Sequence, residues 1–188
     1  MPIFLFHKLV HFGTLNGKPQ VEGEKSMKVY LANGLFSIGD RYVNQYIATE
    51  VRQAIDGIDL YVPQENDAIN DKSSYADSLA IAEADLANLQ ASDVLIAVVD
   101  GVEIDSGVAA EIGVFSTYNR PIIALFSDVR QQGRDNNQKI EALIADGVEN
   151  QFVYRNLFVI GLIKHNGIIV STVEQLVEEV KKLEQKAL

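Results

Sequence analysis

The sequence predicts an α/β fold with a doubly wound sheet of about five mainly parallel strands and helices on both faces. From Met27 onward, strand-like and helix-like segments alternate, which is typical of parallel strands joined by crossover helices. Residues 94–99 and 122–126 are apolar throughout rather than at every second position. Continuous apolar strands are typical of a parallel sheet that is covered on both faces, so these two segments predict its centre.

Each element can be placed along the chain by its pattern. The expected strands are residues 28–32, 58–62, 94–99, 121–126 and 167–170, and the expected helices are residues 40–55, 76–89, 106–118, 137–145 and 172–186. The last helix is amphipathic, with one apolar stripe that consists of Val173, Leu176, Val177, Val180 and Leu183. Residues 1–26 differ from the rest because Gly13, Asn16-Gly17, Pro19 and Gly23 punctuate a short apolar stretch. We therefore expect an N-terminal extension with a hairpin signal, followed by one main domain over residues 27–188.

The composition excludes several classes of function and partner. The chain has 188 residues, which is enough for one domain with a full core. It carries 16 Lys and Arg against 26 Asp and Glu, a net charge of −10, and this argues against a nucleic-acid partner because no basic excess is available for phosphates. There is no cysteine, no apolar run of membrane-spanning length and no basic, cleavable leader pattern. We expect a cytoplasmic protein that does not contact membranes.

Ligands of an open parallel sheet bind beyond the carboxyl ends of its strands, so the segments after the strands are the first candidates. After the first strand comes Asn33-Gly34-Leu35-Phe36, a glycine turn without a dinucleotide fingerprint or a phosphate loop. After the second strand comes Pro63-Gln64-Glu65-Asn66-Asp67, whose side-chain amides are able to read the edge of a planar heterocycle.

The segment after the third strand is the most informative. Asp105-Ser106-Gly107 resembles a helix start, with an acid or hydroxyl at the cap and small residues that allow close approach. Glu111 follows in the second turn among small and apolar residues. A helical glutamate commonly faces solvent, but a lone carboxylate here also fits a nucleophile or general base at the bottom of a pocket. The pattern leaves both interpretations open.

Asp85 is a second acid, in the helix before the third strand. Ile81, Leu86 and Leu89 are predicted to face the core, and from this pattern alone Asp85 is expected to be solvated. The three histidines show no metal-ligand spacing and no serine or cysteine partner pattern, so we expect neither a metal site nor a histidine-based triad.

Taken together, these motifs resemble the nucleoside 2-deoxyribosyltransferase family over roughly residues 27–170. Four elements carry the resemblance: Tyr30-Leu31-Ala32-Asn33-Gly34-Leu35-Phe36, Asp85 eight residues before Asp93, Asp105-x-Gly107-x-x-x-Glu111, and Asn156-Leu157-Phe158. The resemblance implies a flavodoxin-like fold and a catalytic domain over residues 27–188. It also implies that Glu111 is the nucleophile that attacks the anomeric carbon of a 2-deoxyribonucleoside.

The resemblance implies roles for other residues as well. Tyr30 would hold the nucleophile, Asp105 would hydrogen-bond a sugar hydroxyl, and Asp85 would lie near the departing base. Asn156 would reach the sugar 5′-hydroxyl from a neighbouring subunit, which implies a homo-oligomer with shared active sites. The expected substrate-binding residues are Asn33, Gly34, Phe36, Gln64, Asn66, Asp67, Gly107, Asn156 and Phe158. Asp67 stands roughly where the family often has a base-reading glutamine, and a C-terminal helix continues the chain where short members end.

The implied reaction is a double displacement with net retention, in which Glu111 forms a deoxyribosyl ester as one base leaves and a second base then attacks. Its substrates are deoxynucleosides and free nucleobases, and it needs no cofactor. Hydrolysis would be a slow side reaction. Two alternatives remain: a deoxynucleoside 5′-monophosphate N-glycosidase, disfavoured because residues 33–36 contain no arginine, and a non-catalytic nucleoside-binding module. The apolar run 156–163 fits either a subunit interface or a helix buried within one subunit.

Overall fold

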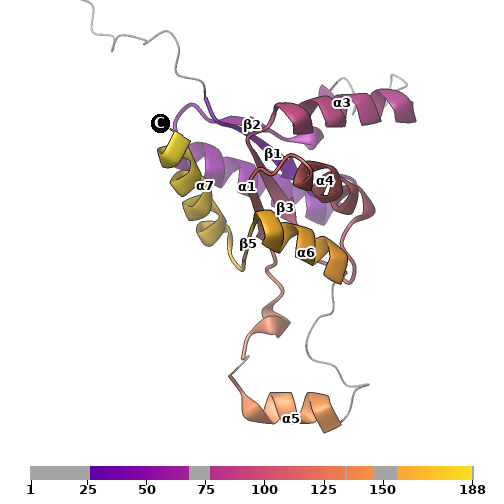
Figure 1. The fold of residues 1–188 in the computed structure, drawn as a ribbon, viewed down its shortest axis with the longest axis vertical. Helices are drawn as coiled ribbons and strands as arrows, with labels where there is room; N and C mark the ends of the chain where they lie inside the picture. Colours follow the sequence, from indigo (N-terminus) through magenta and orange to yellow (C-terminus); the bar gives the residue numbers. More distant parts are fainter. Residues whose placement is uncertain (1–25, 68–76, 134, 146–155, 188) are drawn as a thin grey trace, which may run out of the picture.

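The computed structural model describes residues 26–67, 77–133, 135–145 and 156–187 (Figure 1). The hairpin signal in residues 1–26 therefore lies outside the described residues, apart from Ser26. Within the described part of the chain, no helix is long and apolar enough to cross a membrane.

All five predicted strands are present and form one sheet. They are β1 (Lys28–Ala32), β2 (Asp59–Tyr61), β3 (Val94–Val98), β4 (Ile122–Leu125) and β5 (Gly167–Val170). Every neighbouring pair is parallel, and the order across the sheet is β2-β1-β3-β4-β5. This is the flavodoxin-like order, so the predicted fold class is confirmed.

Helices cover both faces of this sheet (Figure 1). They are α1 (Ile38–Ala54), α3 (Ser78–Ala91), α4 (Ser106–Ser116), α6 (Leu157–Asn166) and α7 (Val173–Ala187). The chain also forms α5 (Asn137–Ala145), which lies apart from the sheet in Figure 1, and the short 3-10 helices η1 (Pro63–Glu65) and η2 (Val129–Gln131). The five predicted helices differ from α1, α3, α4, α5 and α7 only at their ends. The apolar run 156–163 mostly forms α6, which buries Val159 and Ile163 within this chain but leaves Leu157 and Phe158 exposed.

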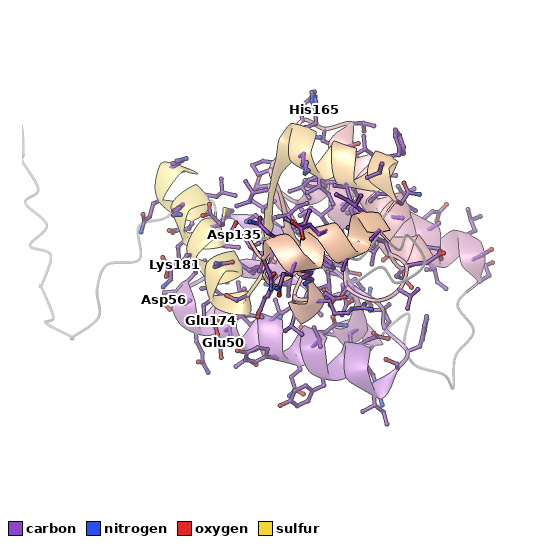
Figure 2. All side chains as sticks on the ribbon, turned by 90° about the horizontal axis from the view of Figure 1, so that it is seen from below. Glu50, Asp56, Asp135, His165, Glu174 and Lys181 are labelled. Atoms are coloured by element: carbon purple, nitrogen blue, oxygen red, sulfur yellow. The ribbon has the colours of Figure 1, made fainter. Side chains whose placement is uncertain are left out.

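Two apolar layers hold the sheet between the helices. On one face, Val29 and Leu31 of β1 pack in a cluster with residues of α1 and α7. Figure 2 labels Glu50 of α1 and Glu174 of α7 where these two neighbouring helices adjoin. On the other face, Tyr30 of β1 belongs to a cluster with residues of α3, α4 and α6. Because side chains alternate along a strand, Tyr30 points to the face opposite that of its two neighbours.

Gly167 is required where β5 pairs with β4. It lies opposite Ile122, and a Cβ atom placed on it would be 1.8 Å from the Ile122 carbonyl oxygen. No side chain fits this space unless the two strands separate.

We expect Gly167→Ala to destabilise the protein by about 3 kcal/mol or more, because the clash is with backbone that cannot rotate away. Gly161→Ala, in the exposed part of α6, is the matched control. Its Cβ would have no neighbour within 4 Å, and alanine favours a helix over glycine by about 0.5–1 kcal/mol. Urea unfolding of both variants measures the difference, and equal stabilities would contradict the steric argument.

Candidate active site

A buried tyrosine of β1 and a glutamate of α4 meet near the carboxyl edge of the sheet. The Tyr30 hydroxyl donates a hydrogen bond to Glu111 Oε1 at 2.6 Å. Tyr30 is fully buried, and Glu111 is mostly buried. Of the two interpretations that the sequence left open for Glu111, the structure therefore supports the inward one. The strand order reverses direction between β1 and β3, and this is the position where folds of this class bind their ligands.

The surroundings of Glu111 disfavour its charge. The pKa of Glu111 is raised to about 7: burial raises it most, the hydrogen bond from Tyr30 lowers it in part, and the charges of Asp85 and Asp105 add to the rise. Burial, followed by the nearby Glu111 carboxylate, raises the pKa of Tyr30 well above its ordinary value. Tyr30 therefore remains a hydrogen-bond donor at every pH at which the protein is studied.

The N-terminus of α4 depends on Asp105, as the sequence predicted for a helix cap. Its Oδ1 accepts hydrogen bonds from the backbone N–H of Gly107 at 2.8 Å and of Val108 at 3.1 Å. A Cβ on Gly107 would lie 3.1 Å from that oxygen, so a small residue is favoured there. The cap fixes the first turn of α4, and Glu111 projects from the next turn.

Asp85 supplies a second acid to the same region. It is partly buried on α3, burial raises its pKa, and the Tyr30 hydroxyl lowers it. The Tyr30 hydroxyl therefore acts on both the Asp85 and the Glu111 carboxyl groups. The prediction that Ile81, Leu86 and Leu89 all face the core was wrong for two of them: Ile81 and Leu86 are 38% and 46% exposed, and only Leu89 is buried. The buried residue of α3 is Leu89 in its C-terminal turn, which belongs to the same apolar cluster as Tyr30.

Tyr61 is a site residue that the sequence analysis missed. It lies opposite Tyr30 in the β1–β2 pairing, and the two rings are 5.2 Å apart between centroids with a tilt of 41°. Asn66, which was predicted to bind substrate, donates to the Tyr61 hydroxyl at 3.1 Å. Burial raises the pKa of Tyr61, and the charges of Asp85 and Glu111 contribute in the same direction. Tyr61 thus connects the segment after β2 to the pair of Tyr30 and Glu111.

Three side-chain amides form a network beyond the ends of β1 and β2. Asn33 Nδ2 donates to Asn44 Oδ1 at 2.8 Å, and Asn44 Nδ2 donates to the Gly34 carbonyl at 3.0 Å and to Gln64 Oε1 at 3.1 Å. Asn33, Gly34 and Gln64 were predicted as substrate-binding residues, and the structure brings them together. Asn44 was missed. A signal was present, because Asn44 occupies the buried stripe of α1 together with Ile47, Ala48 and Val51.

Four other predicted residues lie at the surface of this chain. Phe36 and Phe158 are 82% and 75% exposed, and Asp67 and Asn156 are also exposed. The Asn156 side chain caps α6 by accepting from the backbone N–H of Phe158 and Val159 at 3.1 and 3.2 Å. Within the described part of the chain, none of the four hydrogen-bonds to Tyr30, Asp85 or Glu111.

Glu111→Gln should stabilise the protein at pH 8 and much less at pH 5. The folded-state pKa of Glu111 is about 7 against an ordinary 4.5, so its favourable contribution is complete below about pH 4.5 and is lost as the pH rises through 7. Glutamine does not titrate and keeps an acceptor for Tyr30. We expect a gain of about 1–3 kcal/mol at pH 8.

Thermal unfolding at the two pH values measures this gain. Glu83→Gln on the exposed part of α3 is the control, because it removes one negative charge without changing the buried site. A Glu111→Gln gain that is equal at both pH values, or no larger than that of the control, would contradict the burial of an unfavourable charge.

Comparisons with known proteins identify the family of the chain. The family model described as nucleoside 2-deoxyribosyltransferase matches residues 29–152. Among curated protein sequences there is no match. A crystal structure of a conserved protein from Enterococcus faecalis V583 is 52% identical, with a TM-score of 0.78, and the match covers 84% of this chain and 99% of that one.

Two more distant structures also match. A 2-desoxiribosyltransferase from Leishmania mexicana is 21% identical, with a TM-score of 0.46 over 71% of this chain and 85% of that one. A CMP N-glycosidase, BcmB, from Clostridium botulinum is 15% identical, with a TM-score of 0.43 over 83% of this chain and 98% of that one. The family model spans most of the chain and includes the strand with Tyr30 and the helix with Glu111. This chain belongs to the nucleoside 2-deoxyribosyltransferase family.

Proposed function

We propose that the protein transfers 2-deoxyribose between nucleobases through a covalent deoxyribosyl ester of Glu111. The observation that carries the proposal is the mostly buried Glu111 carboxyl group, held by the Tyr30 hydroxyl at 2.6 Å in a chain of this family. A carboxylate that is shielded from water and fixed in orientation is suited to attack a sugar carbon. Tyr30 holds Oε1, which leaves Oε2 for the reaction.

The proposed reaction consists of two successive displacements at C1′ of the sugar. Glu111 Oε2 attacks C1′ while the C1′–N bond breaks, and the bond electrons go to the departing base, which takes up a proton. The incoming base then attacks C1′ from the side that the first base left, the ester C1′–O bond breaks, and Glu111 regains its charge. The second base loses a proton in return. Two inversions give net retention, and attack by water in the second step yields free deoxyribose.

We assign Asp85 as the proton donor to the departing base. Burial raises the pKa of Asp85, so Asp85 retains a proton more readily than an exposed aspartate. Asp85 also lies close to the nucleophile, because the Tyr30 hydroxyl interacts with both carboxyl groups. Asp105 Oδ1 is used by the helix cap, and we assign its Oδ2 to a sugar hydroxyl. A ribose 2′-hydroxyl would compete for Glu111 and destabilise the oxocarbenium-like transition state, which favours 2-deoxy substrates. The base would lie toward Asn33, Gln64 and Asn66.

A second copy of the chain would complete the site. Leu157 and Phe158 at the start of α6 and Phe36 after β1 are 81%, 75% and 82% exposed, which is unusual for large apolar side chains on a monomer. All three lie near the carboxyl edge of the sheet. The C-terminal end of α6 leads into the amino end of β5, so the N-terminal end of α6, with Leu157 and Phe158, lies at the opposite edge, and Phe36 follows the carboxyl end of β1. We infer that Asn156, at the start of α6, reaches the sugar 5′-hydroxyl of the neighbouring subunit.

Deoxyinosine incubated with free adenine should yield deoxyadenosine and hypoxanthine, and Glu111→Ala should reduce this exchange by at least about 10³-fold, because no other group forms the ester. Chromatography of the products measures it. Circular dichroism shows whether the variant is folded, and Glu83→Ala on the surface of α3 is the control. Near-normal exchange in folded Glu111→Ala would exclude the proposal. If the wild type only hydrolyses a deoxynucleoside monophosphate, the protein is an N-glycosidase. If the wild type binds nucleosides without any reaction, it is a binding module.

Tyr30→Phe should move the acid limb of the pH profile to higher pH. The attacking carboxyl must be ionised, so kcat/KM of the wild type should rise through about pH 7. The Tyr30 hydrogen bond lowers the pKa of Glu111, so its loss raises that pKa. The substrate is a deoxynucleoside whose base is a good leaving group, because such a base departs without a proton from Asp85. An unchanged limb, or a shift to lower pH, would contradict the assigned contact.

Mixing Glu111→Ala protein with Asn156→Ser protein should restore exchange that neither has alone, because hybrid sites combine an intact Glu111 with an intact Asn156. Serine still caps α6 but is too short to reach a neighbour. Mixing Glu111→Ala with Glu111→Gln, which are defective in the same residue, is the control and should remain inactive. Subunit exchange is followed by transfer of an affinity tag. Exchange of subunits without recovery would exclude a shared site.

A further inference from the structure

The amide network centred on Asn44 has a defined hydrogen-bond polarity. Asn44 is only 1% exposed, and both ends of its amide are engaged: Nδ2 donates to two acceptors and Oδ1 accepts one hydrogen bond. Of the described residues, Asn44 and Ser92 are the buried polar ones. Ser92 caps the end of α3 and is remote from the candidate site residues in the fold. Asn44 instead joins three segments at the carboxyl edge of the sheet.

Two backbone carbonyls determine which amide atom is which. The Gly34 carbonyl can only accept, so the Asn44 atom 3.0 Å from it must be nitrogen. The Gln64 atom 3.1 Å from that nitrogen must then be oxygen. The other end of Gln64 confirms this orientation, because it lies 3.4 Å from the Arg41 carbonyl and must be nitrogen as well. The Gln64 oxygen is therefore used internally.

The end of Gln64 that is turned away from Asn44 is consequently the donor Nε2. One N–H of Nε2 points toward the Arg41 carbonyl at the long distance of 3.4 Å, and the second N–H makes no hydrogen bond within the described residues. Gln64 is only partly buried, in η1, two residues before Asn66. Asn66 donates to Tyr61, whose ring packs on Tyr30. The free N–H of Gln64 thus belongs to the same edge of the sheet as the proposed nucleophile.

We propose that Asn44 is a positioning residue that orients Gln64 as a hydrogen-bond donor. The protein then prefers nucleobases that carry a carbonyl oxygen over nucleobases that carry an amino group at the same ring position. The inference rests on the proposed function, because it assigns the base to the Gln64 side of Glu111. A carbonyl oxygen accepts from the Gln64 N–H. An amino group would place N–H against N–H and leave both unpaired.

Asn44→Asp should reverse this polarity. An Asp carboxyl has at most one proton, and the Gly34 carbonyl requires it, so nothing remains to donate to Gln64. Gln64 then gains by turning its NH₂ toward Asp and its oxygen toward the ligand, at the cost of only the long 3.4 Å contact with the Arg41 carbonyl. Gln45→Glu is the matched control, since it makes the same amide-to-carboxyl change on the adjacent, exposed position of α1.

The experiment compares equilibrium binding of hypoxanthine with adenine, and of uracil with cytosine, together with the transfer rates of the matching deoxynucleosides. We expect the wild type and Gln45→Glu to favour the carbonyl-bearing base of each pair by about tenfold, and Asn44→Asp to lose or reverse that ratio. In the double variant Asn44→Asp, Gln64→Ala the ratio should equal that of Gln64→Ala alone, because Asn44 acts through Gln64. A purely structural role would lower all affinities and leave the ratio unchanged.

Two results would overturn the inference: an amino-base preference in the wild type, or an unchanged ratio in folded Asn44→Asp. If Asn44→Asp does not fold, as judged by circular dichroism, Gln64→Glu tests the inference instead. This variant keeps Asn44, and its carboxylate offers the base only hydrogen-bond acceptors. An unchanged ratio in Gln64→Glu also overturns the inference. Base binding with the expected ratio but without transfer would contradict the proposed function alone, and transfer with an unchanged ratio would contradict the inference alone.

Discussion

The parallel pairing of β1 with β3 is the interaction on which the candidate site depends. It aligns Tyr30 with Leu95, so that the tyrosine ring lies under the helix that follows β3. α4 begins at the Asp105 cap and extends over that same face of the sheet, and Glu111 meets the Tyr30 hydroxyl. Tyr30 and Glu111 are 81 positions apart in the chain. Their contact therefore exists only when the central sheet has formed.

The site places an acidic group where the fold would otherwise gain from an apolar one. Burial raises the pKa of Glu111, and the neighbouring acids Asp85 and Asp105 raise it as well. The Tyr30 hydrogen bond compensates only in part. Such a cost is typical of groups kept for chemistry rather than for stability. The surrounding structure supports it with two large apolar layers and a capped helix.

The two sides of the candidate site differ in their chemistry. The acids Glu111 and Asp85 lie on α4 and α3 around the Tyr30 hydroxyl, and the neutral amides of Asn33, Asn44 and Gln64 lie beyond the ends of β1 and β2. The orientations of those amides follow from backbone carbonyls, which accept hydrogen bonds and never donate them. A fixed backbone can therefore determine which pattern of donors and acceptors a ligand meets, through one buried asparagine.

The sequence by itself determined the fold class, the parallel strands, the cap at Asp105 and the apolar stripe of α7. These depend on local patterns: continuous apolar runs, cap residues and helical periodicity act within one segment. It also indicated Glu111, Asp85 and Tyr30 through the family resemblance. Only the tertiary structure decided which way Glu111 faces, because a helix of mostly small and apolar residues has no distinct polar side. Tyr61 was missed, and Ile81 and Leu86 are exposed against expectation, because burial depends on which elements pack together, and strand pairing across the sheet decides that. The apolar stripe of α1 includes Asn44, but only the tertiary structure shows which groups its side chain contacts.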